Sequence, residues 1–392
     1  MKKKLLFVAL YLQTGGVEKS LISLLSNLDY AKYEVDLLLF DHSGMLFKHV
    51  PREVNILPPL FETFSTPITL ALPQLIRKKK FLLVAGKVLA PSVALFSKGV
   101  GTGARWAVYK RILPSVNKEY DVAVSYLDFF TNYYVAQKVK AKKKIVYNHM
   151  DYASKVGWQQ PTLERKTFEQ SNYIVTVAES SKQSLVTAFP EIKHKIRVIH
   201  NSVSPRMIKE LSEAFEPYGS FHGFTIVTVA RLVKEKGVLL ALETCKKIVK
   251  AGKPIRWYLI GGGDLYEELK KRIQQEELEE VFIMLGEKDN PYPYMAHCDV
   301  YVQPSFTEAH CVAVEEALVL AKPVVVTNIP PFQEQINDRV TGILSEPNVE
   351  ALASTLQALI KDRSLRERLT IQLQDNQRNQ EEVHKFIQLL ET

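Results

Sequence analysis

Short apolar runs alternate with helical patterns along most of this 392-residue chain, and this alternation restricts the possible folds most strongly. The runs are continuous in Val, Ile and Leu, and amphipathic stretches such as 17–28 and 179–189 lie between them. Strands that are apolar on both faces and separated by helices are typical of a parallel sheet covered on both sides. In the first half these runs occupy 5–12, 35–40, 122–126, 144–148, 173–177 and 196–200.

The alternation breaks at residues 201–223, which have no strand pattern and contain Pro205 and Pro217. It restarts with apolar runs at 224–230, 256–260, 281–285, 299–303, 323–327 and 341–344. Helical patterns follow at 236–250, 265–275 and 349–361. We therefore predict an α/β protein with two doubly wound, Rossmann-like domains that face a central cleft. The predicted ranges are 1–204 for the N-terminal domain, 205–372 for the C-terminal domain, and 373–392 for a helix that is a candidate to return to the N-terminal domain.

The first residues, Met1 to Lys4 followed by LLFVALYL, resemble a signal peptide. The apolar run is short, however, and no small-residue cleavage site follows it, so we predict a buried first strand. The three cysteines, Cys245, Cys298 and Cys311, form no CxxC pair and no even set. This pattern favours a reduced, cytoplasmic setting.

Charge is divided unequally between the two halves. Residues 1–204 carry 29 Lys and Arg against 15 Asp and Glu, whereas the whole chain has a net charge of only +8. A basic half favours a nucleic acid, an anionic membrane surface or a phosphorylated substrate as partner. No RNP, KH, zinc or helix-turn-helix signature accompanies the charge, so we predict no nucleic-acid partner.

Residues 60–116 do not follow the alternation and combine apolar groups with basic clusters. One interpretation is a helical insertion packed on the sheet. The other is a helical patch that lies peripherally on the anionic inner face of the plasma membrane. The residues grouped in that patch, besides Leu, Val and Phe, are Arg77, Lys78, Lys79, Lys80, Lys87, Lys98, Arg105, Trp106, Lys110 and Arg111.

Two glycine turns follow predicted strands and precede helices. Gly15 and Gly16 permit a phosphate or a sugar to approach the backbone closely, at a helix N-terminus that favours anions. Gly261 to Gly263 resemble a dinucleotide turn, but Tyr266 stands where the third glycine of GxGxxG belongs. This departure argues against nicotinamide binding, and a purely structural role for the second turn stays open.

Charged residues follow two predicted strands of the second domain. Arg231 and Lys236 come directly after the run at 224–230, where a guanidinium and an ammonium suit a diphosphate. Glu308 follows the run at 299–303, and Glu316 lies eight residues later in a predicted helix. Two carboxylates in such positions can accept hydrogen bonds from hydroxyl groups on two different parts of one ligand. Since Lys236 and Glu316 lie outside the apolar runs, replacing either by Ala is predicted to weaken donor binding with little change in stability.

Taken together, these segments resemble the family 4 glycosyltransferases. The matching pieces are GGVEKSL (15–21), VYNH (146–149), KIRVIHNSV (195–203), VARLVKEKG (229–237), LIGGGDLYEEL (259–269) and PSFTEAHCVAVEEAL (304–318). The resemblance spans most of the chain, is most specific over 224–345, and covers 60–116 poorly. It implies the GT-B fold and a retaining enzyme that uses a nucleotide-diphosphate sugar.

The resemblance also implies roles for individual residues. Gly15 and Gly16 would lie near donor phosphate and acceptor, and His149 would face the donor sugar. Arg231 and Lys236 would neutralise the donor diphosphate, Glu308 would lie near the donor sugar, and Glu316 would hold the ribose hydroxyls. The backbone N–H groups of His310, Cys311 and Val312 would meet sugar hydroxyls and phosphate. Ala309 and Cys311 stand where the family usually has glycine, which obscures the identity of the donor sugar.

The predicted activity is hexosyl transfer from a nucleotide sugar, with a UDP-sugar favoured, to a bacterial cell-surface glycan, teichoic acid or lipid-linked acceptor. Charge on the leaving phosphate would be stabilised by the two cations and by helix N-termini. The chain has no Asp-x-Asp motif and no clustered His and Cys ligands, so we predict no metal and no cofactor. Because of Ala309 and Cys311, a non-catalytic partner subunit with the same fold remains an alternative.

Overall fold

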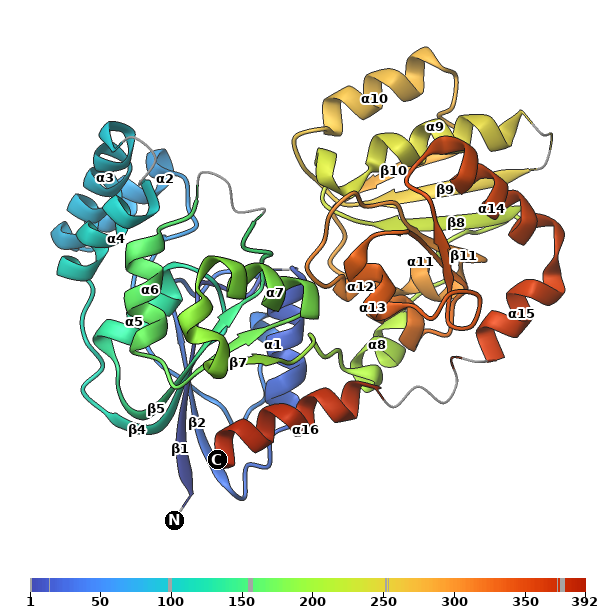
Figure 1. Ribbon diagram of the computed structural model, residues 1–392. Helices are drawn as coiled ribbons and strands as arrows, with labels where there is room; N and C mark the ends of the chain where they lie inside the picture. Colours follow the sequence, from blue (N-terminus) through green and yellow to red (C-terminus); the bar gives the residue numbers. More distant parts are fainter. Residues whose placement is uncertain are drawn as a thin grey trace. The chain divides into compact units, whose positions relative to one another are not determined.

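The computed structural model describes residues 2–13, 15–97, 101–153, 158–250, 252, 254–371, 373 and 378–392, without the side chains of 378–380. The chain forms two compact units (Figure 1). The first comprises Met1–Asn201 and Glu382–Thr392, and the second comprises Ser202–Glu381. The boundary thus lies three residues before the predicted one at 204. Lys98 and the predicted boundary at 372 lie outside the described residues.

The first unit is built on a parallel sheet, which has seven strands within the described residues. Its order is β3-β2-β1-β4-β5-β6-β7, so the chain reverses direction across the sheet between β1 and β4. The strands are β1 (Lys3–Ala9), β2 (Tyr33–Leu39), β3 (Asn55–Ile56), β4 (Glu119–Ser125), β5 (Lys140–Asn148), β6 (Tyr173–Thr176) and β7 (Ile196–Val198). Leu5, Leu6, Phe7 and Val8 of β1 are fully buried, as a central strand covered on both faces requires.

Helices connect these strands and cover the sheet. They are α1 (Gly16–Ser26), α2 (Ile68–Arg77), α3 (Phe81–Phe96), α4 (Gly101–Ile112), α5 (Phe130–Lys138), α6 (Pro161–Glu169) and α7 (Glu179–Ala188), with short 3₁₀ turns η1 (Met45–His49) and η2 (Pro190–Lys195). The predicted first strand is therefore present as β1, and the turn at Gly15 leads into α1. The two-residue strand β3 was not predicted, because it lacks an apolar run of its own.

Residues 60–116 contain helices α2, α3 and α4, which form one group in Figure 1. Leu75, Ala90 and Tyr109 of these helices join the core cluster of the sheet, as the interpretation of a packed insertion predicts. Trp106 is only 2% exposed and its ring lies 5.7 Å from that of Tyr133. Grouping Trp106 with a membrane-facing patch is therefore wrong, because it packs inside the first unit.

The second unit repeats the same architecture with a parallel sheet in the order β10-β9-β8-β11-β12-β13. Its strands are β8 (Phe224–Val229), β9 (Ile255–Ile260), β10 (Phe282–Gly286), β11 (Val300–Gln303), β12 (Val324–Thr327) and β13 (Ile343–Ser345). Its helices are α8 (Pro205–Ser212), α9 (Val238–Val249), α10 (Tyr266–Gln275), α11 (Tyr292–His297), α12 (Val312–Val319), α13 (Pro330–Gln335), α14 (Val349–Lys361) and α15 (Arg363–Ile371), with the turn η3 (Lys234–Lys236). The predicted pair of doubly wound α/β units is confirmed.

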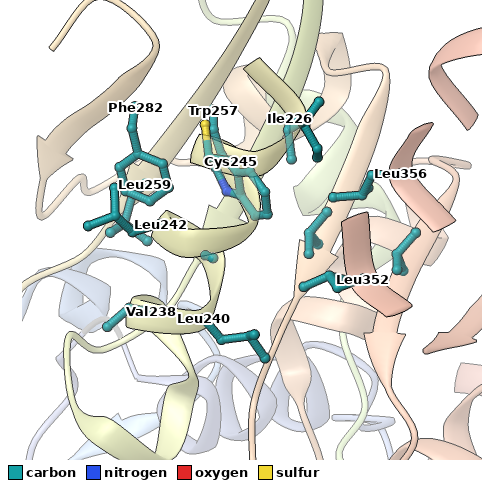
Figure 2. Close-up of a cluster of buried hydrophobic side chains, with 14 of the residues drawn as sticks. Ile226, Val238, Leu240, Leu242, Cys245, Trp257, Leu259, Phe282, Leu352 and Leu356 are labelled. Carbon is teal, nitrogen blue, oxygen red and sulfur yellow. The ribbon is translucent and has the colours of Figure 1, made fainter. Parts of the chain in front are cut away.

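Buried clusters pack against this second sheet. In one of them, shown in Figure 2, Trp257 of β9 lies against Phe282 of β10 and beneath α9, with Leu352 and Leu356 of α14 beside it. The indole Nε1 of Trp257 donates a hydrogen bond to Thr228 Oγ1 at 3.0 Å, so its polar atom is satisfied in the interior. This packing holds the strand ends, and the loops that follow them, in place.

The last helix, α16 (Arg378–Glu391), belongs to the first unit from Glu382 onward. Phe386 is fully buried, with its ring 6.1 Å from Phe7 of β1 and 6.3 Å from Tyr147 of β5. Glu382 Oε2 accepts a hydrogen bond from the backbone N–H of His200 at 2.8 Å. The C-terminal segment therefore completes the core of the first unit.

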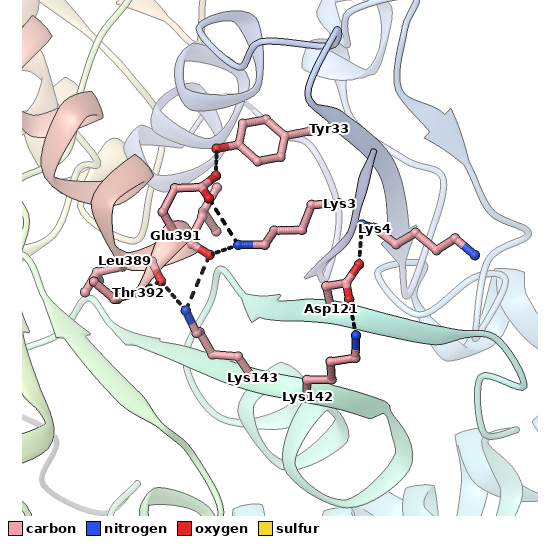
Figure 3. A network of polar contacts seen from close by, with 10 residues as sticks. Lys3, Lys4, Tyr33, Asp121, Lys142, Lys143, Leu389, Glu391 and Thr392 are labelled. Carbon is pink, nitrogen blue, oxygen red and sulfur yellow. Dashed lines mark hydrogen bonds and ion pairs between the residues drawn. The ribbon is translucent and has the colours of Figure 1, made fainter. Parts of the chain in front are cut away.

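Lysines of β1 and β5 bind the last carbonyls of α16 (Figure 3). Lys143 Nζ donates to the carbonyls of Leu389 and Leu390 at 2.9 and 3.4 Å, and Lys3 Nζ donates to Leu390 at 2.6 Å. The last carbonyls of a helix have no partner within the helix, and cations stabilise that end. The neighbouring Lys142 instead binds Asp121 at 2.8 Å on the surface.

We expect Lys143→Met to lower the free energy of unfolding of the first unit by about 1–2 kcal/mol, because half-buried carbonyls lose a charged donor. Lys142→Met is the matched control and should change it by less than about 0.5 kcal/mol, since its ion pair is exposed. Urea unfolding followed by circular dichroism measures both values. Equal effects of the two substitutions would contradict a stabilising contact at the end of α16.

Candidate functional site

Loops that follow β8, β9 and β11 meet at the carboxyl edge of the second sheet. β8 and β11 are neighbours, and the chain proceeds from them in opposite directions across the sheet. At such a switch point, loops diverge and leave a crevice, which is where ligands bind in open α/β sheets. Arg231 and Lys236 follow β8, and Glu308 follows β11. The fold therefore brings these three predicted residues to one edge.

Glycines allow these loops to pack backbone against backbone. Gly237 has φ +63°, and a Cβ there would lie 1.8 Å from the carbonyl oxygen of Pro304. Gly261 has φ +145°, and a Cβ there would lie 1.9 Å from the carbonyl oxygen of Ala230. Only glycine fits both positions. The turn at Gly261–Gly263 thus supports the neighbouring loop sterically, which accounts for its glycines without a bound dinucleotide.

Lys236 forms an ion pair with Glu308. The distance from Lys236 Nζ to Glu308 Oε2 is 2.5 Å, and the side chains are 17% and 6% exposed. Ser305 Oγ donates to the other oxygen, Glu308 Oε1, at 2.8 Å. Gln303 Nε2 in turn donates to Ser305 Oγ at 3.0 Å. Glu308 is therefore held in one orientation by a cation on one oxygen and a hydroxyl on the other.

Arg231 differs from Lys236 because its guanidinium makes no ion pair or hydrogen bond to the described part of the chain, and the residue is exposed. The charges of Lys236 and Glu308 compensate each other at close range. Arg231 therefore supplies a positive charge, next to the end of β8, that no carboxylate among the described residues compensates. An anionic group can form a bidentate contact with it without displacing a protein partner.

The N-terminus of α12 is held by Gln335 of α13. Gln335 Oε1 accepts the backbone N–H of Cys311 at 2.9 Å, and its Nε2 donates to the carbonyl of Cys311 at 3.1 Å and to Glu315 Oε1 at 3.0 Å. The Cys311 N–H, which the sequence assigns to a ligand, thus has Gln335 as its partner in this structure, and a ligand that used this donor would displace Gln335. Val312 is the first residue of α12, and Cys311 is its N-cap.

The side chain of Cys311 is buried, and burial is the main reason that the pKa of its thiol is raised, with nearby Glu308 adding to the effect. It is thus a thiol and not a reactive thiolate. His310 Nε2 lies 3.7 Å from Glu315 Oε1, and both side chains are buried. The side chains of Cys311, His310 and Glu315 are thus part of the protein interior.

Glu316 lies in α12 and is only 1% exposed. Its Oε1 accepts a hydrogen bond from the hydroxyl of Tyr292, in α11, at 2.7 Å. Burial, and then the carboxylate of Glu316, raise the pKa of Tyr292 well above its ordinary value, so the phenol stays a donor. The buried carboxylate of Glu316 is therefore stabilised by the hydroxyl of Tyr292. The expectation that Glu316→Ala leaves stability almost unchanged no longer follows.

Gly15 and Gly16 lie at the start of α1, directly after β1, at the carboxyl edge of the first sheet. Gly15 is the N-cap of the helix, and its carbonyl accepts the N–H of Lys19 at 3.1 Å. A Cβ at Gly15 would lie 2.3 Å from Glu18 Oε2, so the side chain of Glu18 folds back over the cap. Glu18 is 8% exposed, and burial raises its pKa to about 7.

His149 follows β5 at the same edge of the first sheet and is 6% exposed. Its backbone N–H donates to Asp128 Oδ2 at 2.9 Å, and its ring stacks on Tyr147 at a centroid distance of 5.2 Å. Tyr126 connects this group to α1, because its ring lies 5.4 Å from His149 and its hydroxyl is 2.9 Å from Ser20 Oγ. Gly15, Gly16 and His149 thus share one edge of the first unit.

The predicted residues fall into two groups, one in each unit, and the structure adds residues that the sequence did not indicate. Ser305, Gln335, Tyr292 and Glu18 each contact or orient a predicted residue. Glu18 and Ser305 lie inside quoted motifs, 15–21 and 304–318, but nothing in the spacing signals the burial of Glu18 or the contact of Ser305 with Glu308. The partnership of Gln335 with Cys311 spans 24 residues and depends on how α12 and α13 pack. Among the described residues, no group of three or more His, Cys, Asp or Glu is placed to hold a metal ion.

Comparison with known proteins gives the second unit a match. Residues 216–375 match the family described as "Glycosyl transferases group 1". The amylovoran biosynthesis glycosyltransferase AmsK of Erwinia amylovora is 33% identical over 143 residues, which cover 34% of this chain and 35% of that protein. The Campylobacter jejuni N-acetylgalactosamine-N,N'-diacetylbacillosaminyl-diphospho-undecaprenol 4-alpha-N-acetylgalactosaminyltransferase is 26% identical over 201 residues, 51% of this chain and 53% of that protein. The chain thus matches about a third to a half of the length of these relatives.

Solved structures resemble the whole chain. Anabaena Alr3699/HepE in complex with UDP and glucose aligns with a TM-score of 0.70 over 99% of both chains, at 18% identity. WaaG, a glycosyltransferase involved in lipopolysaccharide biosynthesis, aligns with a TM-score of 0.66 over 98% of this chain and 99% of that chain, at 12% identity. These likenesses show the fold, which is that of the GT-B glycosyltransferases.

Proposed function

We propose that this protein transfers a sugar from a nucleotide-diphosphate sugar, with a UDP-sugar as the favoured donor, since residues 216–375 match the glycosyl transferases group 1 family and the chain has a GT-B fold. The observation that carries the proposal is the position of Arg231 and Lys236, two cations in the loop after β8 at the switch point of the second sheet. Proteins of the same fold, including HepE, have been solved with UDP, which supports uracil as the base of the donor nucleotide.

The contacts of these residues support a division of roles within the donor site. Arg231, which has no ion pair or hydrogen bond among the described residues, would receive the diphosphate. Lys236 is paired with Glu308 and would exchange this partner for phosphate oxygens when donor binds. Glu308 would then be released toward the donor sugar, still held by Ser305. Glu316, fixed by Tyr292, would accept the ribose hydroxyls. The backbone N–H groups of His310, Cys311 and Val312 would contact phosphate and sugar, and for Cys311 this contact would replace the hydrogen bond to Gln335.

We propose that transfer retains the configuration of the sugar. The bond from the anomeric carbon to the diphosphate oxygen breaks, and that oxygen keeps the bonding electron pair. The acceptor hydroxyl forms its bond to the anomeric carbon from the same face, and its proton passes to the leaving phosphate. Arg231 and Lys236 would stabilise the charge that develops on the leaving group.

The proposed acceptor is a cell-surface glycan, a teichoic acid or a lipid-linked saccharide. The names of the relatives support this class, because one acts in amylovoran biosynthesis and another on a diphospho-undecaprenol-linked substrate. TarM of S. aureus, whose fold is similar with a TM-score of 0.69 at 13% identity, has been solved with alpha-GlcNAc-glycerol and UDP.

A thermal-shift screen of UDP-, GDP- and ADP-sugars tests the donor. We expect UDP-sugars to raise the melting temperature of the protein and Arg231→Ala to remove this shift. No shift with any of the three classes would contradict the donor site. Hydrolysis or transfer of the bound donor then separates an enzyme from the alternative, a non-catalytic partner subunit, which would bind the donor without turning it over.

We expect His149→Ala to lower turnover about tenfold, the loss equivalent to one hydrogen bond in the transition state, and to change donor affinity much less. The reason is that His149 lies in the first unit, whereas the residues assigned to the diphosphate and the ribose lie in the second. Steady-state kinetics and donor titration separate the two quantities. If donor affinity fell and turnover of bound donor stayed normal, His149 would be a ground-state contact.

For the location, we propose the cytoplasm, with peripheral attachment to the inner face of the plasma membrane. Cys245, Cys298 and Cys311 are all buried free thiols, which is consistent with a reducing compartment. Within the described residues, no helix is long and apolar enough to cross a bilayer. Any attachment through those residues would therefore use the surface of the protein.

A further inference from the structure

Helix α3 exposes a continuous apolar stripe on the surface of the first unit. Phe81, Val88 and Leu95 form one row at intervals of seven residues, and Leu82, Leu89 and Phe96 form a second row beside it. Seven residues are almost two helical turns, so both rows run along one side of the helix. The exposed fractions of these six residues are 63, 40, 84, 68, 50 and 88% in that order. Soluble surfaces rarely leave an apolar stripe of this size uncovered.

The inner side of α3 shows that this exposure is built into the packing. Its buried residues are the small Gly86 and Ala90, and a Cβ at Gly86 would lie 2.1 Å from Ile112 Cδ1 of α4. Lys87 also turns inward, where its Nζ donates to the carbonyls of Thr63 and Phe64 at 2.8 and 2.9 Å. An ordinary amphipathic helix does the opposite and buries its large apolar residues. In α3, Leu83 and Val84 also pack against the core cluster, but the six residues of the two rows face outward.

Positive charge collects at the Phe81 end of the stripe. Arg77 is the last residue of α2, and Lys79 lies in the turn between α2 and α3. Lys110 and Arg111 lie in the last turn of α4, which the contact of Gly86 with Ile112 places at the same end. All four are exposed. The sequence from 63 to 118 contains ten Lys and Arg and no Asp or Glu. Lys78 and Lys80, by contrast, are paired with Glu62.

We propose that the stripe of α3 inserts into the headgroup region of a bilayer that contains anionic lipid, with the cations of the α2–α3 turn and the end of α4 on the lipid phosphates. An apolar stripe without hydrogen-bonding groups suits acyl chains, and a neighbouring basic cluster suits an anionic surface. The exposed Ile68, Leu70 and Ile76 of α2 extend the apolar surface. This inference specifies the location proposed above and does not depend on the identity of the donor.

A second copy of the chain fits this surface less well. A two-fold interface would bring each basic cluster against the same patch of its partner, and that patch has no carboxylate between residues 63 and 118 to compensate it. Like charges at an interface oppose association. Anionic lipid supplies the missing negative charge, so the bilayer is the occupant that the charge pattern favours.

Vesicle sedimentation of the full chain tests the proposal. The stripe variant is Leu82→Gln/Leu89→Gln/Phe96→Gln, and its matched control replaces three exposed apolar residues of the second unit, Phe215→Gln/Val340→Gln/Ile371→Gln. The charge variant is Arg77→Gln/Lys79→Gln/Lys110→Gln. Each protein is mixed with phosphatidylcholine vesicles with and without phosphatidylglycerol, at low and high salt. Thermal unfolding confirms that each variant is folded.

We expect the wild type and the control to bind the anionic vesicles, and the stripe variant to bind them at least about tenfold more weakly. The charge variant should lose about 10- to 100-fold on anionic vesicles, and high salt should weaken the wild type in the same direction. Unchanged binding of the folded stripe variant would overturn the proposal. So would a wild-type dimer, measured without vesicles, that the stripe substitutions dissociate. Donor-induced thermal shifts are measured in parallel, so that failure of the donor site is distinguished from failure of the membrane surface.

Discussion

Replacing Lys236 with Met is expected to lower the rate of sugar transfer about 10- to 100-fold, because the leaving diphosphate loses one of its two cations. A charge-assisted contact contributes about 1.5–3 kcal/mol, and each 1.4 kcal/mol corresponds to about tenfold in rate. Lys234→Met is the matched control, since Lys234 is exposed and lies in the same short turn, η3. Lys236→Arg should restore part of the activity. Initial rates with saturating acceptor measure these effects.

The same substitution should also lower stability, contrary to what the position of Lys236 in a loop suggests. Without the ammonium, the buried carboxylate of Glu308 keeps only the Ser305 hydroxyl as a described partner. We expect a loss of about 1–3 kcal/mol. Glu308→Gln in the same chain should recover most of the stability but not the activity. Recovery of both, or normal transfer by Lys236→Met alone, would remove Lys236 from the proposed mechanism.

The second large effect concerns Glu18. Because its carboxyl is buried, its pKa in the folded protein is about 7 instead of 4.5. Below pH 4.5 the residue is protonated in both the folded and the unfolded chain. As the pH rises from 4.5 to 7, the unfolded chain releases this proton first, so the free energy of unfolding falls. The total loss above pH 7 is about 3 kcal/mol.

Glu18→Gln should remove this pH dependence. At pH 8 we expect the variant to be more stable than the wild type by up to about 3 kcal/mol, and at pH 4.5 the two should be nearly equal. Glu179→Gln is the control, because Glu179 occupies the first turn of α7 but is exposed. Urea unfolding at several pH values gives the difference. A constant difference between wild type and Glu18→Gln across this range would show that Glu18 is not buried as a carboxylic acid.

The loop between Glu308 and Glu316 departs from the pattern of the family, and the structure shows what replaces the usual glycines. Gln335 forms hydrogen bonds with both backbone groups of Cys311 and with the buried Glu315. Glycines would let the backbone of this loop approach a ligand closely. In this chain a side chain of α13 holds the loop instead. The N–H of Cys311 therefore has a side-chain partner within the chain.

Much of the fold could be predicted from local patterns. Continuous apolar runs indicated the central strands, and the glycine turn at Gly15 and Gly16 indicated the start of α1. Helix α8 was missed although its signal was present: Ser204 caps it, accepting the N–H of Met207 at 3.4 Å, and Pro205 is its first residue. Pro205 and Pro217 mark a break in the alternation, but proline is compatible with the first turn of a helix, which is where Pro205 stands.

The sequence by itself determined the class of the protein, because the alternation of apolar runs and helices allows few arrangements. It also placed Arg231, Lys236 and Glu308 after strand ends and Glu316 in the helix that follows. Only the tertiary structure decided how these groups are paired. The ion pair of Lys236 with Glu308 joins residues 72 positions apart, and the bond of Tyr292 to Glu316 joins two helices. Side-chain burial was decided in the same way: Trp106 lies inside and Phe96 outside, although both stand in apolar, basic surroundings in the sequence. Periodicity is a local property, whereas pairing and burial depend on which surfaces meet when the elements pack.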